Sequence, residues 1–436
     1  MTYAAVSEVI PSARRLIRSL RDLGYDLPVA LSDVIDNSIE AGASHVRIDT
    51  AFQGEESWLR VTDNGVGMTP TELREAMRFG TRRDYCDEDL GKFGLGLKSA
   101  SLSQCRRLTV ATRTTRAGRI HLAQWDLDHV EKSDRWEVLR PPARQCTRAI
   151  DPLHLRAGTV VLWERLDRVT RYHSPDGRRS ETHFSRLVEE FSEHLSMTFH
   201  RFLGGEARRG RRVTIEVNGE PLEPWDPFSR QERATVVMPP QRLRLVYDGR
   251  RHDICVRPFL LPPESAYSSQ AAHARAAGPR LWSRQQGLYF YRNDRLIQAG
   301  GWNRLRTQDE HTKLARIAVD IPGSADEVFE LSVSKTQVRL PASIRADLAA
   351  ITSAICKMAE NAYRRPRRAP ETAPPSSPPQ VTAVQSLVRM VLRTTEEVLR
   401  TELAESTELA DHLVGRLREM ELQFISELMA RAHMDT

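Results

Sequence analysis

Hydrophobic and polar positions alternate in two distinct rhythms along the first 170 residues. Residues 30–43 (ALSDVIDNSIEAGA) carry apolar side chains at steps of three and four, which predicts an amphipathic helix. Short runs rich in β-branched residues predict strands, among them HVRIDT, WLRVTD, RLTVAT and GTVVLWERL. Helices interspersed with short strands indicate a mixed α/β sandwich in this part of the chain.

A second pattern follows and then breaks off. Between about residue 180 and residue 363, the runs RRVTIEVNG, LRLVYDG, GLYFYRNDRLI and ARIAVDI predict strands, and PASIRADLAAITSAICKMAENAY predicts a helix. Residues 364–380 (RRPRRAPETAPPSSPPQ) lose all periodicity and predict a linker. Helical spacing then returns, with a break near Ser406 and Thr407. This tail either packs back on its own domain or forms a helical hairpin that binds a partner or a second copy.

These patterns predict an α+β protein of four parts. The first is residues 1–175, a two-layer α/β sandwich, and the second is residues 176–363, a further α+β domain. Residues 364–380 form the linker, and residues 381–436 form the helical tail.

Composition and charge narrow the classes of protein. Of the 436 residues 40% are hydrophobic, and no apolar run approaches the 18 or so residues of a membrane span. The N-terminus lacks the apolar core of a secretory signal, so we expect a cytoplasmic protein without a membrane partner. Five cysteines without a CxxC pair favour reduced thiols over zinc or disulfides. A net charge of +6, with arginine clusters at residues 206–212 and 363–368, permits contact with DNA; solvated loops would show the same pattern.

The predicted helix of residues 30–43 has one apolar and one polar face. Asp33 and Asn37 are four residues apart and share a face, with Glu40 close by, and Gly42 lies where the helix should end. The polar face suits a binding site, although a solvated acidic face would have the same pattern.

The stretch LRVTDNGVGMTPTEL predicts a strand that ends at Asp63, a tight turn at Gly65 and Gly67, and a helix capped by Thr69 and Glu72. An ionised aspartate only accepts hydrogen bonds. It would therefore take the amino proton of adenine and repel the carbonyl oxygen of guanine. Alone, an Asp-Asn-Gly turn is a weak signal, because such turns are common in hairpins.

Two further motifs follow. DLGKFGLGLKSASLSQC places glycines before a predicted helix, whose free N–H groups favour phosphate, and it matches neither a P-loop nor a Rossmann motif. GTVVLWERL opens a strand with Gly158 and Thr159 and says little by itself.

In this order, across roughly residues 20–170, the four motifs resemble those of the GHKL ATPase superfamily, which includes gyrase, Hsp-type chaperones, histidine kinases and MutL. The resemblance implies the Bergerat fold, an antiparallel sheet covered by helices with ATP between them. It implies that Asn37 coordinates Mg²⁺, that Asp63 reads adenine, and that Thr159 supports Asp63 through water. The implied base pocket is Gly65, Gly67 and Met68, and the implied phosphate cradle is Lys92, Gly94, Leu95, Gly96, Leu97 and Lys98.

Asp33 departs from that family's pattern. It stands where the hydrolysing members keep a glutamate that activates water, and it is shorter by one methylene. A misplacement of roughly 1 Å can lower a rate about a hundredfold, so hydrolysis is either slow, mediated by a second water, or absent. We expect Asp33 to be the base, and Asp36 and Glu40 to be structural. Residues 78–92 (RFGTRRDYCDEDLGK) correspond to the ATP lid of the superfamily.

The second domain favours one branch of the superfamily. GLYFYRNDRLIQAGGWNRL and FELSVSKTQVRLP resemble the transducer, a ribosomal S5-like domain, of MutL and especially of MORC-type ATPases. That likeness implies that Lys335 reaches the γ-phosphate. Only about 30 residues precede the first motif and no histidine occurs before His45, which argues against a histidine kinase.

The resemblance therefore predicts an ATP-dependent homodimeric clamp that binds and hydrolyses ATP with Mg²⁺. Its cargo would be DNA or a DNA-processing complex, since bacterial relatives of this kind are associated with DNA handling and antiphage defence. A partner protein could bind the C-terminal helices. A chaperone-like ATPase acting on proteins and a nucleotide-binding scaffold remain the alternatives.

Overall fold

The computed structural model describes residues 10–22, 25–80, 96–169, 176–330 and 338–364, together with residues 415, 416 and 419. The chain divides into two compact units, Met1–Arg365 and Pro366–Thr436. In the second unit the three described residues are helical, as expected for the tail. The remainder of the tail, and the linker beyond Arg364, lie outside the described residues.

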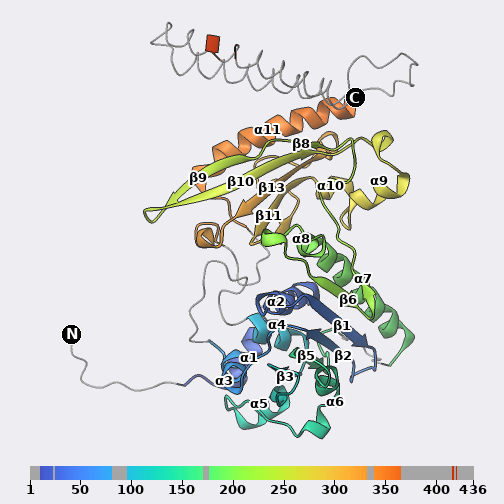
Figure 1. Cartoon of the computed structure of the whole chain (residues 1–436), viewed down its shortest axis with the longest axis vertical. Coiled ribbons are helices and arrows are strands. Elements are labelled where there is room, and N and C mark those ends of the chain that lie inside the picture. The colour runs from blue at the N-terminus through green and yellow to red at the C-terminus, as the bar shows by residue number, and fades with distance from the viewer. Residues whose placement is uncertain are drawn as a thin grey trace, which may run out of the picture. The chain divides into compact units, whose positions relative to one another are not determined.

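The first unit contains two sheets (Figure 1). The first sheet has seven strands in the order β4-β3-β5-β2-β1-β6-β7, in which every neighbouring pair is antiparallel except β1 and β6. The strands are β1 (His45–Ala51), β2 (Trp58–Asp63), β3 (Arg107–Arg113), β4 (His121–Asp126), β5 (Gly158–Glu164), β6 (Thr214–Val217) and β7 (Glu220–Pro221).

Helices cover both faces of this sheet, as alternation along β5 makes clear. Val161 and Trp163 point into the core shared with α2 (Leu27–Glu40), α4 (Gly96–Gln104) and α7 (Arg178–Thr198), whereas Val160 and Leu162 point to a smaller cluster with α6 (Thr147–Ile150). The remaining helices of this part are α1 (Ala13–Arg21), α3 (Pro70–Ala76), α5 (Leu127–Ser133) and α8 (His200–Leu203), with the short 3-10 turns η1 (Ala143–Gln145), η2 (Asp151–Leu153) and η3 (Arg208–Gly210).

The second sheet has the order β12-β11-β13-β10-β8, with β9 paired to β10. The long helix α11 (Ala342–Arg364) packs against β9, β10 and β13 and buries one apolar face of the sheet. The strands are β8 (Val236–Val237), β9 (Gln241–Tyr247), β10 (Arg250–Leu260), β11 (Gly287–Arg292), β12 (Arg295–Ala299) and β13 (Ala315–Ile321); the other helical segments are α9 (Gln270–Ala277), α10 (Leu281–Gln285), η4 (Glu264–Ala266), η5 (Glu310–Thr312) and η6 (Gly323–Ala325).

The predicted mixed α+β fold is confirmed, and the local signals behave as the sequence indicates. Gly42, at φ +76°, ends α2: its N–H donates to the carbonyl of Ile39, and the N–H of Ala43 donates to the carbonyl of Ser38. Thr69 and Glu72 form the expected capping box of α3.

The first sheet includes β6 and β7, which lie beyond the boundary expected at residue 175. The division of the chain into four parts remains a prediction. Within the described ranges, no helix is both long and apolar enough to cross a membrane.

Candidate functional site

Asp63 ends β2 as a buried carboxylate with three defined partners. Only 4% of the residue is exposed. One oxygen accepts hydrogen bonds from the N–H groups of Gly65 (2.9 Å) and Thr159 (3.1 Å), and the other accepts from the hydroxyl of Ser38 (3.1 Å). Burial raises the pKa of Asp63, and the three hydrogen bonds act in the opposite direction. A turn, a helix and a neighbouring strand thus fix one acceptor group.

The two glycines of the turn allow the backbone to pack tightly there. At Gly67, with φ +67°, a β-carbon would lie 2.3 Å from the carbonyl oxygen of Arg113, and at Gly65 it would lie 2.8 Å from that of Ala41. No L-residue with a side chain fits the first position without movement. The turn therefore lies directly against the end of β3 and the end of α2.

Thr112 of β3 connects this turn to β5. Its hydroxyl accepts a hydrogen bond from the N–H of Met68 (2.8 Å), donates to the carbonyl of Gly158 (3.2 Å) and lies 3.2 Å from the hydroxyl of Thr159. The contact of Thr159 with Asp63 is made directly by its N–H. Neither Thr112 nor Ser38 was predicted as a site residue. The strand register, in which Thr112 lies opposite Thr159, is what reveals Thr112.

Asp33 lies on α2 with 4% of the residue exposed. A β-carbon at Gly96 would be 3.5 Å from its Oδ2. The carboxylate therefore lies against the first turn of α4. Burial and the neighbouring charge of Asp33 raise the pKa of Tyr25, so the Tyr25 hydroxyl stays neutral.

Asn37 is the one exposed residue of α2, whose described length is otherwise buried or half-buried. It follows Asp33 by one helical turn and so lies on the same side of the helix. The structure thus places an uncharged amide, whose oxygen could bind a metal ion, on the exposed side of α2 one turn after the buried Asp33.

The first turn of α4 contributes Gly96, Leu97 and Lys98. Leu97 packs against the first core, and Lys98 is 3% exposed with its Nζ donating to the carbonyl of Ala76 (3.0 Å). Burial lowers the pKa of Lys98 to about 8, against the opposing effect of Glu75. The ammonium group of Lys98 is therefore buried beside the carbonyl of Ala76. The other predicted phosphate and lysine positions, Lys92, Gly94, Leu95 and Lys335, lie outside the described residues, as does most of the expected lid, residues 81–92.

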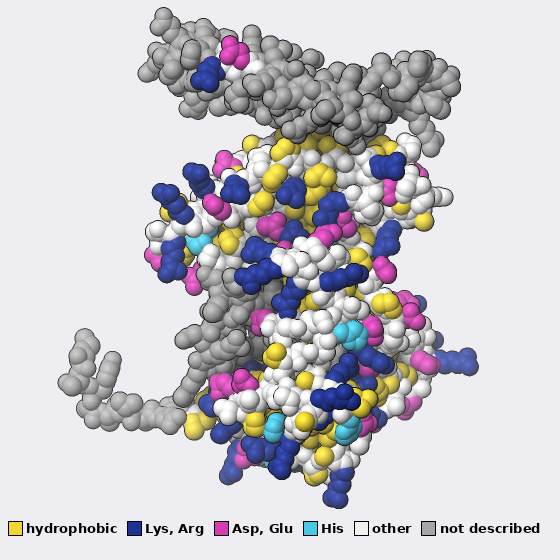
Figure 2. Space-filling model, viewed as in Figure 1, with side chains coloured by type: hydrophobic (Ala, Val, Ile, Leu, Met, Phe, Trp, Pro, Cys, Tyr) yellow, Lys and Arg dark blue, Asp and Glu magenta, His cyan; other side chains and the backbone are white. Residues whose placement is uncertain are grey.

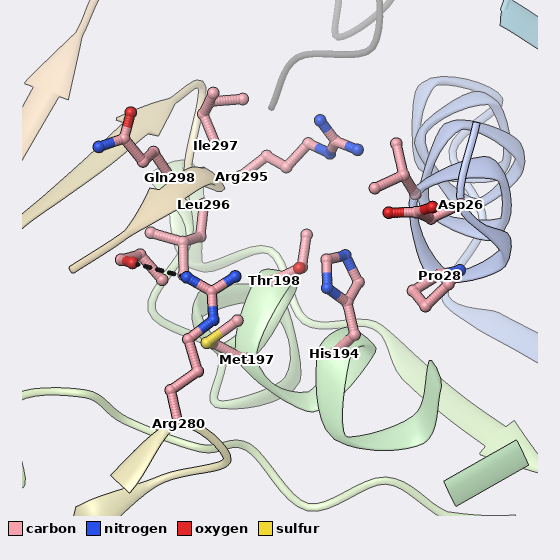
Figure 3. A pocket seen from close by; sticks show the side chains of 12 residues that line it. Asp26, Pro28, His194, Met197, Thr198, Arg280, Arg295, Leu296, Ile297 and Gln298 are labelled. Atoms are coloured by element: carbon pink, nitrogen blue, oxygen red, sulfur yellow. Dashed lines mark hydrogen bonds between the residues drawn. The ribbon is translucent and has the colours of Figure 1, made fainter. Parts of the chain in front are cut away.

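A cation from the second sheet also reaches this site. Nη2 of Arg295, on β12, is 3.6 Å from Oδ1 of Asp33, and its Nε is 3.0 Å from Oδ1 of Asp36. The same arginine lines a cavity of about 270 Å³ together with His194, Arg280 and Asp26 (Figure 3). No role for Arg295 was predicted, because 262 residues separate it from Asp33 and only the fold brings the two together.

The described residues favour one way of holding a metal ion. No group of three or more His, Cys, Asp or Glu side chains among them could form a metal cage. Mg²⁺ usually keeps several waters and binds one or two protein ligands together with substrate phosphates. The single exposed amide of Asn37 fits that mode.

Comparisons with known proteins concern the same part of the chain. Residues 25–159 match the family model described as Histidine kinase-, DNA gyrase B-, and HSP90-like ATPase, which confirms the GHKL resemblance for that segment. The match includes Asp33, Asn37, Asp63 and Thr159.

Individual relatives point to the MutL and MORC branches. DNA mismatch repair protein MutL of Rhizobium meliloti (strain 1021) is 37% identical over 91 residues, 20% of this chain and 15% of the relative. MutL of Shewanella amazonensis (strain ATCC BAA-1098 / SB2B) is 24% identical over 279 residues, 62% of this chain and 36% of the relative. ATPase morc-1 of Caenorhabditis elegans is 32% identical over 84 residues, 19% of this chain and 10% of the relative. In each case the aligned part is well under two thirds of the relative's length.

Proposed function

We propose that this chain binds ATP with Mg²⁺ and hydrolyses it. The observation that carries the proposal is Asp63, a buried acceptor held by Gly65, Thr159 and Ser38 at a glycine turn within the ATPase-like segment. With its first oxygen occupied by two N–H donors, the second can accept the amino proton of adenine.

The base that activates water is Asp33 in this proposal. Its carboxylate takes a proton from the attacking water as that oxygen bonds to the γ-phosphorus, and the bond to the β–γ bridging oxygen breaks to leave ADP. Mg²⁺ would supply charge neutralisation on the phosphates, and Asn37 would hold it. Lys335 would approach the γ-phosphate from the second domain, and the first turn of α4 would lie along the phosphates.

The fate of the γ-phosphate tests the class of activity. With γ-labelled ATP we expect labelled free phosphate from the wild-type chain, as an ATPase produces. Label retained on the protein would indicate a kinase, and retention of all label in intact ATP would indicate a scaffold. For the variant Asp33→Asn, Asp49→Asn is a matched control. Asp49 is also a buried carboxylate, but it pairs with Arg47 on β1 and Arg60 on β2.

We further propose that nucleotide-driven closure of a dimer acts on DNA. The β9–β10 hairpin supports this step: five arginines and two aspartates lie between residues 241 and 260, and all five arginines are exposed (Figure 2). A twisted two-stranded ribbon with such a charge excess suits the phosphate backbone of a duplex. The five are Arg242, Arg244, Arg250, Arg251 and Arg257.

A chaperone-like ATPase acting on protein partners is the alternative. It would use the same nucleotide site, and its binding to partners would not fall steeply with salt. Salt dependence of DNA binding therefore separates the two, because release of counterions makes a DNA clamp strongly salt-sensitive.

A further inference from the structure

Arg295 forms a buried bridge between the second sheet and the helix that carries Asp33. The side chains of Arg295, Asp33 and Asp36 are 3%, 4% and 1% exposed. A cation between two carboxylates at this depth offsets part of the cost of burying their charges. The bridge joins β12 of the second sheet to helix α2, which packs on the first sheet.

The two contacts of Arg295 differ in length, and the difference assigns them different roles. The ion pair of its Nε with Oδ1 of Asp36 is the closer one, at 3.0 Å, whereas its Nη2 is 3.6 Å from Oδ1 of Asp33. Asp36 therefore anchors the guanidinium. Asp33 lies between this cation, the neutral side chain of Tyr25, and the first turn of α4 at Gly96.

We propose that Arg295 is a positioning residue for ATP hydrolysis: anchored on Asp36, it fixes the Asp33 carboxylate beside the first turn of α4, so the second domain completes the site. The inference rests on the proposed role of Asp33 as the base.

Within the described part of the chain, Arg295 forms ion pairs with Asp33 and Asp36. Behind it, on the cavity side, burial lowers the pKa of His194 to about 4, with Arg295 and Arg280 as further causes, so His194 is neutral near pH 7 (Figure 3). A guanidinium facing a carboxylate favours the ionised form of that carboxylate. Among the described residues, the titratable and charged side chains near Asp33 or Arg295 include Tyr25, Asp26, Asp36, His194 and Arg280.

The test uses the full chain and follows both turnover and its pH dependence. Arg295→Gln removes the cation, and we expect the turnover number to fall about ten- to a hundredfold from misorientation of the base. The acid limb of the pH profile should move up by about one unit, because the carboxylate loses a facing cation. Arg295→Lys should return the acid limb to its wild-type position and recover part of the turnover. ATP affinity should stay within about twofold in both variants, since neither touches the base pocket.

Arg292→Lys provides the matched control. Arg292 lies on β11, next to β12 in the same sheet, and its Nε is 2.7 Å from Asp326, with both side chains 4% exposed. It is thus an equally buried arginine paired with an aspartate, but its described partner Asp326 is not on α2. Loss of folded protein in this variant would lower the apparent turnover without moving the pH profile.

The outcomes separate this inference from the proposed function. An unchanged acid limb in Arg295→Gln, with turnover reduced no more than in Arg292→Lys, would overturn the positioning role alone. Normal turnover in Asp33→Asn would instead overturn the base assignment on which it rests. If Arg295→Gln does not fold, Asp36→Asn tests the same point: it removes the anchor while keeping the side-chain shape, and it should lower turnover in the same way.

Discussion

At the scale of single residues, the proposed role of Asp63 in reading the base predicts how ATP affinity depends on pH. Adenine needs the ionised form, and burial raises the pKa of this carboxyl group. ATP affinity should therefore be full above the raised pKa and should fall as the pH drops through it, by about tenfold per unit below it. Titrating ATP across the whole pH range in which the chain stays folded measures this; affinity that stays level throughout would show that Asp63 does not read the base.

Asp63→Asn tests the same proposed role by replacing one carboxylate oxygen, an acceptor, with an NH₂ group, a donor. The oxygen that faces Gly65 and Thr159 must remain an acceptor, so the new amide NH₂ faces the base. It would oppose the amino group of adenine and favour the carbonyl of guanine. We expect the ratio of ATP to GTP affinity to fall at least about tenfold, as a site with a mismatched buried polar group predicts. Competition binding with both nucleotides measures the ratio.

Gly67→Ala tests the packing of the turn. The positive φ alone should lower the free energy of unfolding by about 1–3 kcal/mol, and a β-carbon 2.3 Å from the carbonyl oxygen of Arg113 should lower it further. Gly42→Ala is the control: Gly42 also has a positive φ, of +76°, but nothing lies within 4 Å of its β-carbon position. Denaturant unfolding should show a clearly larger loss at Gly67, and equal losses would contradict the close packing of this turn.

Local patterns mark Asp33, Asn37 and Asp63 as candidates, and the structure places two of them on α2 and the third at the end of β2. Ser38 and Arg295 stand within the quoted motifs, but their residue types alone predict no contact with a carboxylate of the site. Ser38 and Thr112 reach the turn through helix-to-strand packing and strand register. Arg295 reaches Asp33 and Asp36 on α2 from the second sheet.

At the scale of elements, the pairing of β3 with β5 supports the turn through Thr112. Thr112→Val keeps the shape and removes the acceptor of the Met68 N–H, leaving that N–H without its partner. An unsatisfied buried donor costs about 1–3 kcal/mol, so ATP affinity should fall about fivefold or more if the turn must be rigid to bind the base. Calorimetric titration checks this, with Thr109→Val as the control, since Thr109 is equally buried on β3 but bonds to Gln124. Equal affinities in the two variants would remove Thr112 from the site.

The limits of prediction at this scale are also physical. The signals for α2, α3 and the strands β1, β2, β3 and β5 are local, in alternation and in caps, and they hold in the structure. The elements that were not predicted include α7 and β10. The 21 residues of α7 carry many polar side chains, and β10 contains Pro258, so neither shows a clear pattern of its element type. The parallel pairing of β6 with β1 could not be predicted either, because it joins segments about 170 residues apart.

At the scale of the whole molecule, the β9–β10 hairpin is the surface on which a DNA cargo is tested. Replacing Arg242, Arg244 and Arg251 with alanine should weaken duplex binding regardless of sequence. The salt slope should fall by about 0.9 for each phosphate contact that is lost. Binding isotherms at several salt concentrations measure it. The control removes Arg144, which is exposed on η1 beside the first sheet; an identical slope in the hairpin variant and in the wild type would place any DNA elsewhere.

The central claim is that α2 carries the base of an ATPase, and single-turnover phosphate release tests it most directly. Wild-type chain and Asp33→Asn are compared at saturating ATP, with nucleotide binding measured on the same samples. We expect the variant to bind ATP as the wild type does. Its rate of phosphate release should be at most about one hundredth of the wild-type rate, as loss of a general base predicts. Phosphate release at the wild-type rate from Asp33→Asn would contradict this account.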